Sequence, residues 1–103
     1  MSWASTALER LQRGETITIR PRGRSMTGKV NDGDRVTVEP ATGRELSVGD
    51  IVLVRVHGHV YLHLIKAKQG ERLLIGNNRG GVNGWVGRNA VYGVALHIEA
   101  VRR

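Results

Sequence analysis

The feature that most constrains the fold is a series of short stretches in which apolar and polar residues alternate, each ended by glycine or proline. Residues 16–20 alternate strictly before Pro21, and residues 35–39 alternate again before Pro40. Alternation with a period of two is typical of strands with one buried face. Proline does not continue a central strand. The series therefore predicts a mainly β fold built from short strands.

Further strands are predicted at residues 51–56, 60–65, 73–75 and 91–98. The first two flank the compact turn at residues 57–59, which indicates a hairpin. Residues 41–50 are predicted as a loop that turns Leu46 and Val48 inward. Short strands separated by regular turn signals are typical of a small all-β barrel or sandwich.

One segment shows the helical period instead. Between residues 2 and 13, the apolar residues Ala4, Leu8 and Leu11 fall on one face. Gly14 provides a stop signal. We therefore expect one short N-terminal helix before the strands. With no internal repeat and no linker, the 103 residues are predicted to form a single domain over residues 1–103.

Composition excludes several classes of protein. Cysteine is absent, so the chain has neither disulfides nor thiolate metal ligands. No apolar run approaches the roughly 20 residues of a membrane span, and the N-terminus lacks the residue order of a signal peptide. We therefore expect a soluble cytoplasmic protein that does not associate with membranes.

The chain is basic, with 16 Lys and Arg residues against 9 acidic residues and a net charge of +7. Such a charge attracts polyanions. However, the cations are dispersed, and only Arg20, Arg22 and Arg24 cluster tightly. A solvated cationic surface is the favoured interpretation, and nucleic-acid binding is the weaker one.

Ser25 lies in the segment Gly23-Arg24-Ser25-Met26, after Pro21 and Gly23 have broken the preceding strand. A sharp turn can expose the hydroxyl as a nucleophile, and neighbouring amides can face a developing oxyanion. Serine is also an ordinary residue of glycine-rich turns. The turn alone favours this second interpretation, so the first depends on a base elsewhere in the chain.

His63 lies in the apolar segment 60–65, where burial would keep the imidazole neutral and able to accept a proton. The alternative, which this segment alone favours, is a core histidine bonded to one backbone group. A zinc site is the third interpretation, because His57 and His59 share the strand parity of His63. The turn at Gly58 directs those two away, so we expect neither metal nor another cofactor.

The order of these segments resembles the LexA-like and signal-peptidase superfamily of serine peptidases. That pattern runs G-x-S-M-x-P, D-G-D before an apolar strand, l-x-x-G-D-I-V, a hairpin with the base, G-D-N and a terminal W-V-x-x-x-x-V-x-G. The counterparts in this chain are residues 23–28, 32–36, 46–52, 60–63, 76–78 and 84–93. The resemblance covers roughly residues 16–96. The histidine at position 63 resembles the endoplasmic-reticulum and archaeal type of signal peptidase, which has histidine at the position of the base.

The resemblance implies that Ser25 is the nucleophile and His63 its general base. It also implies that the backbone N–H groups of Arg24 and Ser25 face the oxyanion. An extended peptide would add as a β-strand in a cleft. The residues implied to line that cleft are Met26, Ile17 and Ile19.

The chain departs from the pattern at two places. Gly28 replaces the proline that follows S-M-x, and the acidic third member would fall at Asn77 or Asn83, both amides. Asn77, in the segment similar to G-D-N, is the candidate orienting residue. Two functions remain open. One is a minimal soluble serine endopeptidase with a Ser25–His63 dyad that cleaves a partner protein. The alternative is a catalytically degenerate module that binds peptides or proteins.

Overall fold

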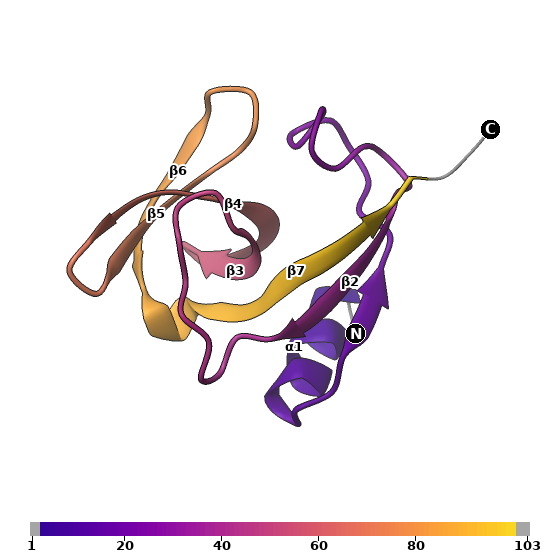
Figure 1. Ribbon diagram of the computed structural model, residues 1–103, viewed down its shortest axis with the longest axis horizontal. Coiled ribbons are helices and arrows are strands. Elements are labelled where there is room, and N and C mark those ends of the chain that lie inside the picture. Colours follow the sequence, from indigo (N-terminus) through magenta and orange to yellow (C-terminus); the bar gives the residue numbers. More distant parts are fainter. Residues whose placement is uncertain (1–2, 101–103) are drawn as a thin grey trace.

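The computed structural model describes residues 3–100 and shows a mainly β protein with one N-terminal helix (Figure 1). This confirms the predicted fold class. The elements are α1 (Trp3–Gln12), β1 (Ile17–Ile19), β2 (Arg35–Pro40), β3 (Ile51–Val56), β4 (His59–Gln69), β5 (Arg72–Gly76), β6 (Val82–Gly87), the 3₁₀ turn η1 (Arg88–Ala90) and β7 (Val91–Glu99).

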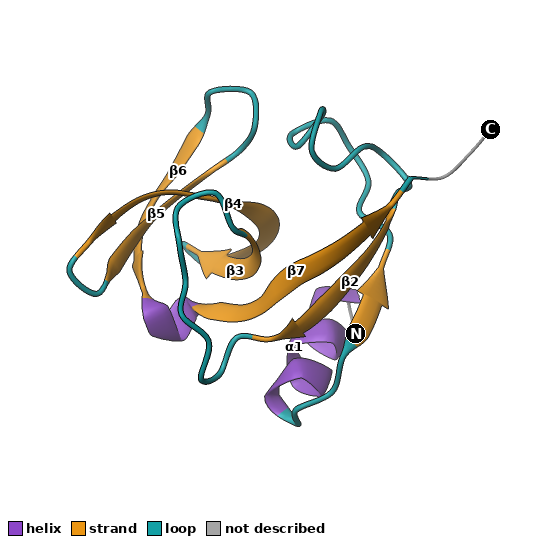
Figure 2. Ribbon diagram, viewed as in Figure 1, coloured by secondary structure: helices purple, strands orange, loops and turns teal. Residues whose placement is uncertain are grey.

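All seven strands belong to one antiparallel sheet in the order β1-β2-β7-β3-β4-β5-β6. The sheet is coiled but not closed, because in the described part of the chain β1 and β6 are each paired on one side only. Helix α1 packs beside β1, β2 and β7 (Figure 2). No helix within residues 3–100 has the length and apolar character needed to span a membrane.

Two hydrophobic clusters lie on the sheet, and strand alternation separates them. The first includes the apolar face of α1 and contains Ala7, Leu8, Leu11, Ile17, Met26, Val30, Val36, Val38, Leu53, Leu62 and Leu64. The second contains Ala41, Leu46, Val52, Val54, Val56, Ile65, Leu73, Ile75, Val91 and Val94. In β3, Leu53 belongs to the first cluster, whereas its neighbours Val52 and Val54 belong to the second. Strand β3 therefore joins both cores.

The helix and most strands lie close to their predicted ranges, although Ser2, the predicted helix start, lies outside the described residues. Helix α1 ends at Gln12, and Gly14 follows in the left-handed region with φ +85°. Strand β4 extends to Gln69, beyond the predicted end at Ile65. A register shift between Ile65 and Ala67 interrupts the regular alternation there.

Two details differ from the sequence prediction. Strand β6 was not predicted, because no residue in it is fully buried and it lacks the apolar face that produces alternation. The prediction that Val48 turns inward was wrong, since its side chain is 59% exposed. Val48 lies in a turn in which the Asp50 N–H donates to the Ser47 carbonyl, while Leu46 is buried as predicted.

Candidate active site

The loop between β1 and β2 presents Ser25 on the surface. Next to it, the side chain of Met26 is buried in the first hydrophobic cluster and anchors the loop. The loop is closed near its base, where the Gly23 N–H donates to Asp32 Oδ1 at 2.6 Å. Further along, the Asn31 N–H donates to Oδ2 of the buried Asp34 at 2.8 Å. The two acids of the D-G-D segment therefore hold the loop in shape.

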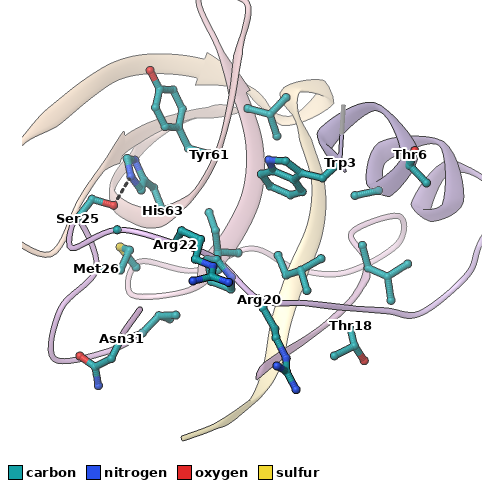
Figure 3. Close-up of a pocket in the computed structure, with 18 of the residues that line it drawn as sticks. Trp3, Thr6, Thr18, Arg20, Arg22, Ser25, Met26, Asn31, Tyr61 and His63 are labelled. Atoms are coloured by element: carbon teal, nitrogen blue, oxygen red, sulfur yellow. Dashed lines mark hydrogen bonds between the residues drawn. The ribbon is translucent and has the colours of Figure 1, made fainter. Parts of the chain in front are cut away.

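His63 on β4 reaches this loop from a strand 38 residues away in sequence. Its Nε2 lies 3.2 Å from Ser25 Oγ, and its Nδ1 lies 2.8 Å from Asn83 Oδ1 on β6. Figure 3 shows the Ser25 and His63 side chains pointing toward each other. The structure thus brings the predicted nucleophile and base into direct contact.

The partners of His63 define its tautomer. A carbonyl oxygen only accepts, so Nδ1 carries the proton and donates it to Asn83. Nε2 is then the acceptor for the Ser25 hydroxyl. Burial lowers the pKa of His63 below its ordinary value of 6.5, and the hydrogen bond to Asn83 opposes this shift. At neutral pH the imidazole is uncharged and able to accept the serine proton.

Tyr61 is a further contact of the base that the sequence analysis did not single out. It lies two residues before His63 on the same strand, so both side chains are on one face. The rings are stacked, with centroids 4.7 Å apart and an interplanar angle of 19°. The Tyr61 ring therefore limits rotation of the imidazole and covers one of its faces.

The sequence analysis chose Asn77 as the residue that orients His63. The structure corrects this choice, because the amide that contacts His63 is that of Asn83. Asn77 Oδ1 accepts the N–H groups of Arg79 and Gly81, at 2.9 and 2.8 Å, and so shapes the β5–β6 turn. Its backbone carbonyl accepts a hydrogen bond from Lys66 Nζ at 2.9 Å. Asn77 is thereby occupied as a turn residue.

Asn78 links this turn to the serine loop. Its backbone N–H donates to the Ser25 carbonyl at 2.9 Å, and its Nδ2 donates to the Thr27 carbonyl at 2.8 Å. Gly28, at the position of the expected proline, has φ +97°. Proline is fixed near −65° and cannot adopt that conformation. In this chain the contacts of Asn78 hold the turn without the proline.

Two backbone amides beside the hydroxyl are available to a ligand. Within residues 3–100, the N–H groups of Arg24 and Ser25 donate no hydrogen bond. The N–H groups of Gly23 and Thr27 donate to Asp32 and to the Arg24 carbonyl. The Met26 N–H, like those of Arg24 and Ser25, donates no hydrogen bond within residues 3–100. The loop thus leaves open the two amides implied for the oxyanion, together with that of Met26.

A cleft of about 660 Å³ extends from the Ser25–His63 pair toward α1. The three residues expected in the cleft, Ile17, Ile19 and Met26, all line it. Helix α1 contributes Trp3 to the lining (Figure 3) and also Arg10, which the sequence analysis did not anticipate. The cleft thus has an apolar floor, the Ser–His pair near one end and a helix along part of its wall.

The histidines weighed as zinc ligands do not form a common site. His57 and His59 are exposed around the β3–β4 turn, whereas His63 is buried against Asn83 and Ser25. Within residues 3–100, no three His, Cys, Asp or Glu side chains gather closely enough to hold a metal ion.

Comparison with known proteins agrees with the geometry. A family model described as Peptidase S24-like matches residues 2–84, which include Ser25, His63 and Asn83. None of the curated proteins compared with the chain gives a significant match. The family match covers most of the chain and supports the resemblance to LexA-like domains. The chain therefore belongs to the Peptidase S24-like family.

Proposed function

We propose that this chain is a serine peptidase that cleaves a peptide bond in a partner protein, with Ser25 as nucleophile and His63 as general base. The observation that carries the proposal is the contact of 3.2 Å between Ser25 Oγ and Nε2 of a buried, neutral imidazole. Nucleophile and base within hydrogen-bond reach, with the base held by a third group, is the arrangement that activates serine.

The chemistry follows from the protonation states. Nε2 accepts the hydroxyl proton as Ser25 Oγ forms a bond to the carbonyl carbon of the scissile peptide. The Arg24 and Ser25 N–H groups then donate to the carbonyl oxygen, which has become negative. His63 returns the proton to the leaving amine as the C–N bond breaks. Water, deprotonated by the same nitrogen, releases the acyl group from Ser25.

Asn83 is a positioning residue in this scheme. It holds the Nδ1–H tautomer, which leaves Nε2 free to act as a base. Being neutral, it gives less stabilisation to the imidazolium than a carboxylate would. We therefore propose slow turnover, on a peptide bound in extended form along the cleft.

We also propose a cytoplasmic location, which the absence of cysteine supports, because disulfides are rare in that compartment.

A second function is supported by the same amide. Because the partner of His63 Nδ1 is an amide, the cleft also fits a peptide-binding module without turnover. In that case peptides bind equally well to the native chain and to Ser25→Ala, and neither protein cleaves them.

Covalent labelling separates the two functions. We expect a fluorophosphonate probe to add one adduct, detected by intact mass, and peptide mapping to place it on Ser25. Ser25→Ala is expected to abolish the adduct and His63→Gln to slow its formation strongly. Ser47→Ala, which changes another exposed serine in a turn, is the matched control and should label normally. A folded native chain without an adduct, or equal labelling of Ser25→Ala, would overturn the peptidase proposal.

A further inference from the structure

We infer that the cleft selects acidic peptide segments and that Arg20 and Arg22 recognise their carboxylates. This inference rests on the proposed function, because it names the substrate class of the same site. Both arginines lie on the segment that leads from β1 to Ser25, and both line the cleft (Figure 3). The recognition would therefore take place beside the nucleophile.

The charge of the cleft has one sign. Its lining includes Arg10, Arg20 and Arg22, and no Asp or Glu among the described residues. Arg10 is neutralised, since its Nε lies 2.9 Å from Glu15 Oε1. Within residues 3–100, Arg20 and Arg22 form no ion pair or side-chain hydrogen bond. Two guanidinium groups are thus left for a ligand.

The backbone of this segment favours recognition by side chains. A peptide can pair with the edge strand β1, whose outer side pairs with no other strand among residues 3–100. Pro21 lacks an N–H group, and its carbonyl already accepts the Gly33 N–H at 3.0 Å. The strand ladder is therefore interrupted between Arg20 and Arg22. Guanidinium groups bind carboxylates with two parallel hydrogen bonds, so these side chains can hold the peptide where the ladder stops.

The surroundings favour an acidic peptide over a nucleic acid. Arg24, the third member of the sequence cluster, lines a different hollow together with Asp32 and Asp34. The three arginines therefore do not form one continuous basic surface. The floor beneath Arg20 and Arg22 is apolar and includes Ile17 and Met26. Such a floor suits apolar side chains that alternate with acidic ones along an extended peptide.

The test uses Ser25→Ala, which binds without cleaving. The probes are decapeptides of alternating Ala and Glu, Ala and Gln, or Ala and Lys, each carrying a neutral dye, and a dT12 oligonucleotide. We expect fluorescence anisotropy at low salt to show several-fold tighter binding of the Glu peptide than of the Gln peptide, since Arg20 and Arg22 are exposed and each exposed ion pair raises affinity only about two- to five-fold. The preference should shrink as salt is added.

Matched variants assign the preference to residues. Adding Arg20→Gln and Arg22→Gln together should reduce the ratio of Glu to Gln binding to about one, while Arg72→Gln, an exposed arginine on β5, should leave it unchanged. Equal binding of the three peptides, or a preference that survives the double change, would overturn the inference. Tighter binding of dT12 than of the Glu peptide, lost in the double variant, would also overturn it.

Labelling distinguishes failure of this inference from failure of the proposed function. The native chain, with Ser25 and both arginines present, should react with the fluorophosphonate probe. Labelling without any acidic preference would refute the substrate class alone. An acidic preference without labelling would refute the peptidase and support acidic-peptide recognition by a binding module.

Discussion

Asn83 occupies the place where a Ser–His–Asp peptidase holds a carboxylate, and this exchange separates two roles that a carboxylate combines. The amide oxygen still accepts the Nδ1 proton at 2.8 Å, so the orientation and tautomer of His63 are kept. The negative charge that would stabilise the imidazolium is missing. At the level of single residues, the site is therefore positioned for proton transfer but poor in electrostatic stabilisation.

A carboxylate at position 83 tests whether orientation of His63 and stabilisation of the imidazolium are separate roles. We expect Asn83→Asp to raise the rate of fluorophosphonate labelling at neutral pH by at least about tenfold, because loss of such a carboxylate costs about 10⁴ in rate in a Ser–His–Asp triad. The measurement is the second-order labelling rate constant from intact mass. Asn77→Asp places the same charge in the nearby turn and is expected to give a much smaller gain. Equal gains from both variants would contradict the positioning role of Asn83.

The lowered pKa of His63 predicts the pH dependence of labelling. In the proposed mechanism the base acts while neutral, and burial keeps His63 neutral below its ordinary pKa of 6.5. We expect the labelling rate constant to decline as pH falls, with a midpoint below 6.5. In Asn83→Asp the carboxylate favours the imidazolium, so the midpoint should move upward. A native midpoint above 6.5 would contradict the desolvated imidazole.

The sequence could indicate Ser25 and His63 but could not distinguish Asn83 from Asn77. Both amides lie around the β5–β6 turn, where the register shifts between Ile75 and Gly76. A bulge changes which face later residues point to, so counting along the chain does not reveal which amide reaches β4. Tyr61 was missed for another reason, since a tyrosine in an apolar strand is usually a packing residue.

At the level of elements, the β5–β6 turn acts as the support of the serine loop. The side-chain oxygen of Asn77 shapes this turn by accepting two of its backbone N–H groups. Asn78 then donates to the carbonyls of Ser25 and Thr27. The segment similar to G-D-N is therefore structural in this chain. It replaces the rigidity that a proline at Gly28 would have provided.

Asn78→Ala should loosen that support. The variant keeps the backbone bond to Ser25 but loses the side-chain bond to Thr27, whose net contribution is about 0.5–1.5 kcal/mol. We expect labelling of Ser25 to slow several-fold and amide exchange at residues 25–28 to accelerate, with a modest loss of stability. Asn89→Ala, an exposed amide on η1, is the control and should change neither. Unchanged labelling in Asn78→Ala would show that the loop holds its shape without this contact.

Element boundaries were predictable where one face of a strand is buried. Strand β3 was predicted with the observed bounds, since its flanks carry clear turn signals. Strand β6 was not predicted, because it lies at the edge of the sheet and its side chains, including Val82 and Trp85, are partly or fully exposed. The position of β6 is set by its pairing with β5. The alternation of apolar and polar residues within a single segment does not reveal such a contact between strands.

At the level of the whole molecule, the two hydrophobic clusters share the strands of one sheet. Leu53 contributes to the cluster beneath α1, and the adjacent Val52 and Val54 contribute to the other. Neither cluster can lose β3 without disrupting its neighbour. The Ser25–His63 pair lies across this arrangement, with Ser25 on the β1–β2 loop and His63 on β4. Cooperative folding of both clusters is thus a condition for assembling the site.

The two tryptophans can test this cooperativity, because Trp3 lies on α1 and Trp85 on β6. In Trp85→Phe the fluorescence reports Trp3, and in Trp3→Phe it reports Trp85. We expect the fluorescence transition of each variant in urea to coincide with its own far-UV circular dichroism transition. Leu53→Ala should lower the free energy of unfolding by about 2–5 kcal/mol in both backgrounds, because it removes a fully buried side chain from β3, the strand that both clusters share. An earlier Trp3 transition, or a shift by Leu53→Ala in one background only, would show that α1 and its cluster unfold separately from the rest of the sheet.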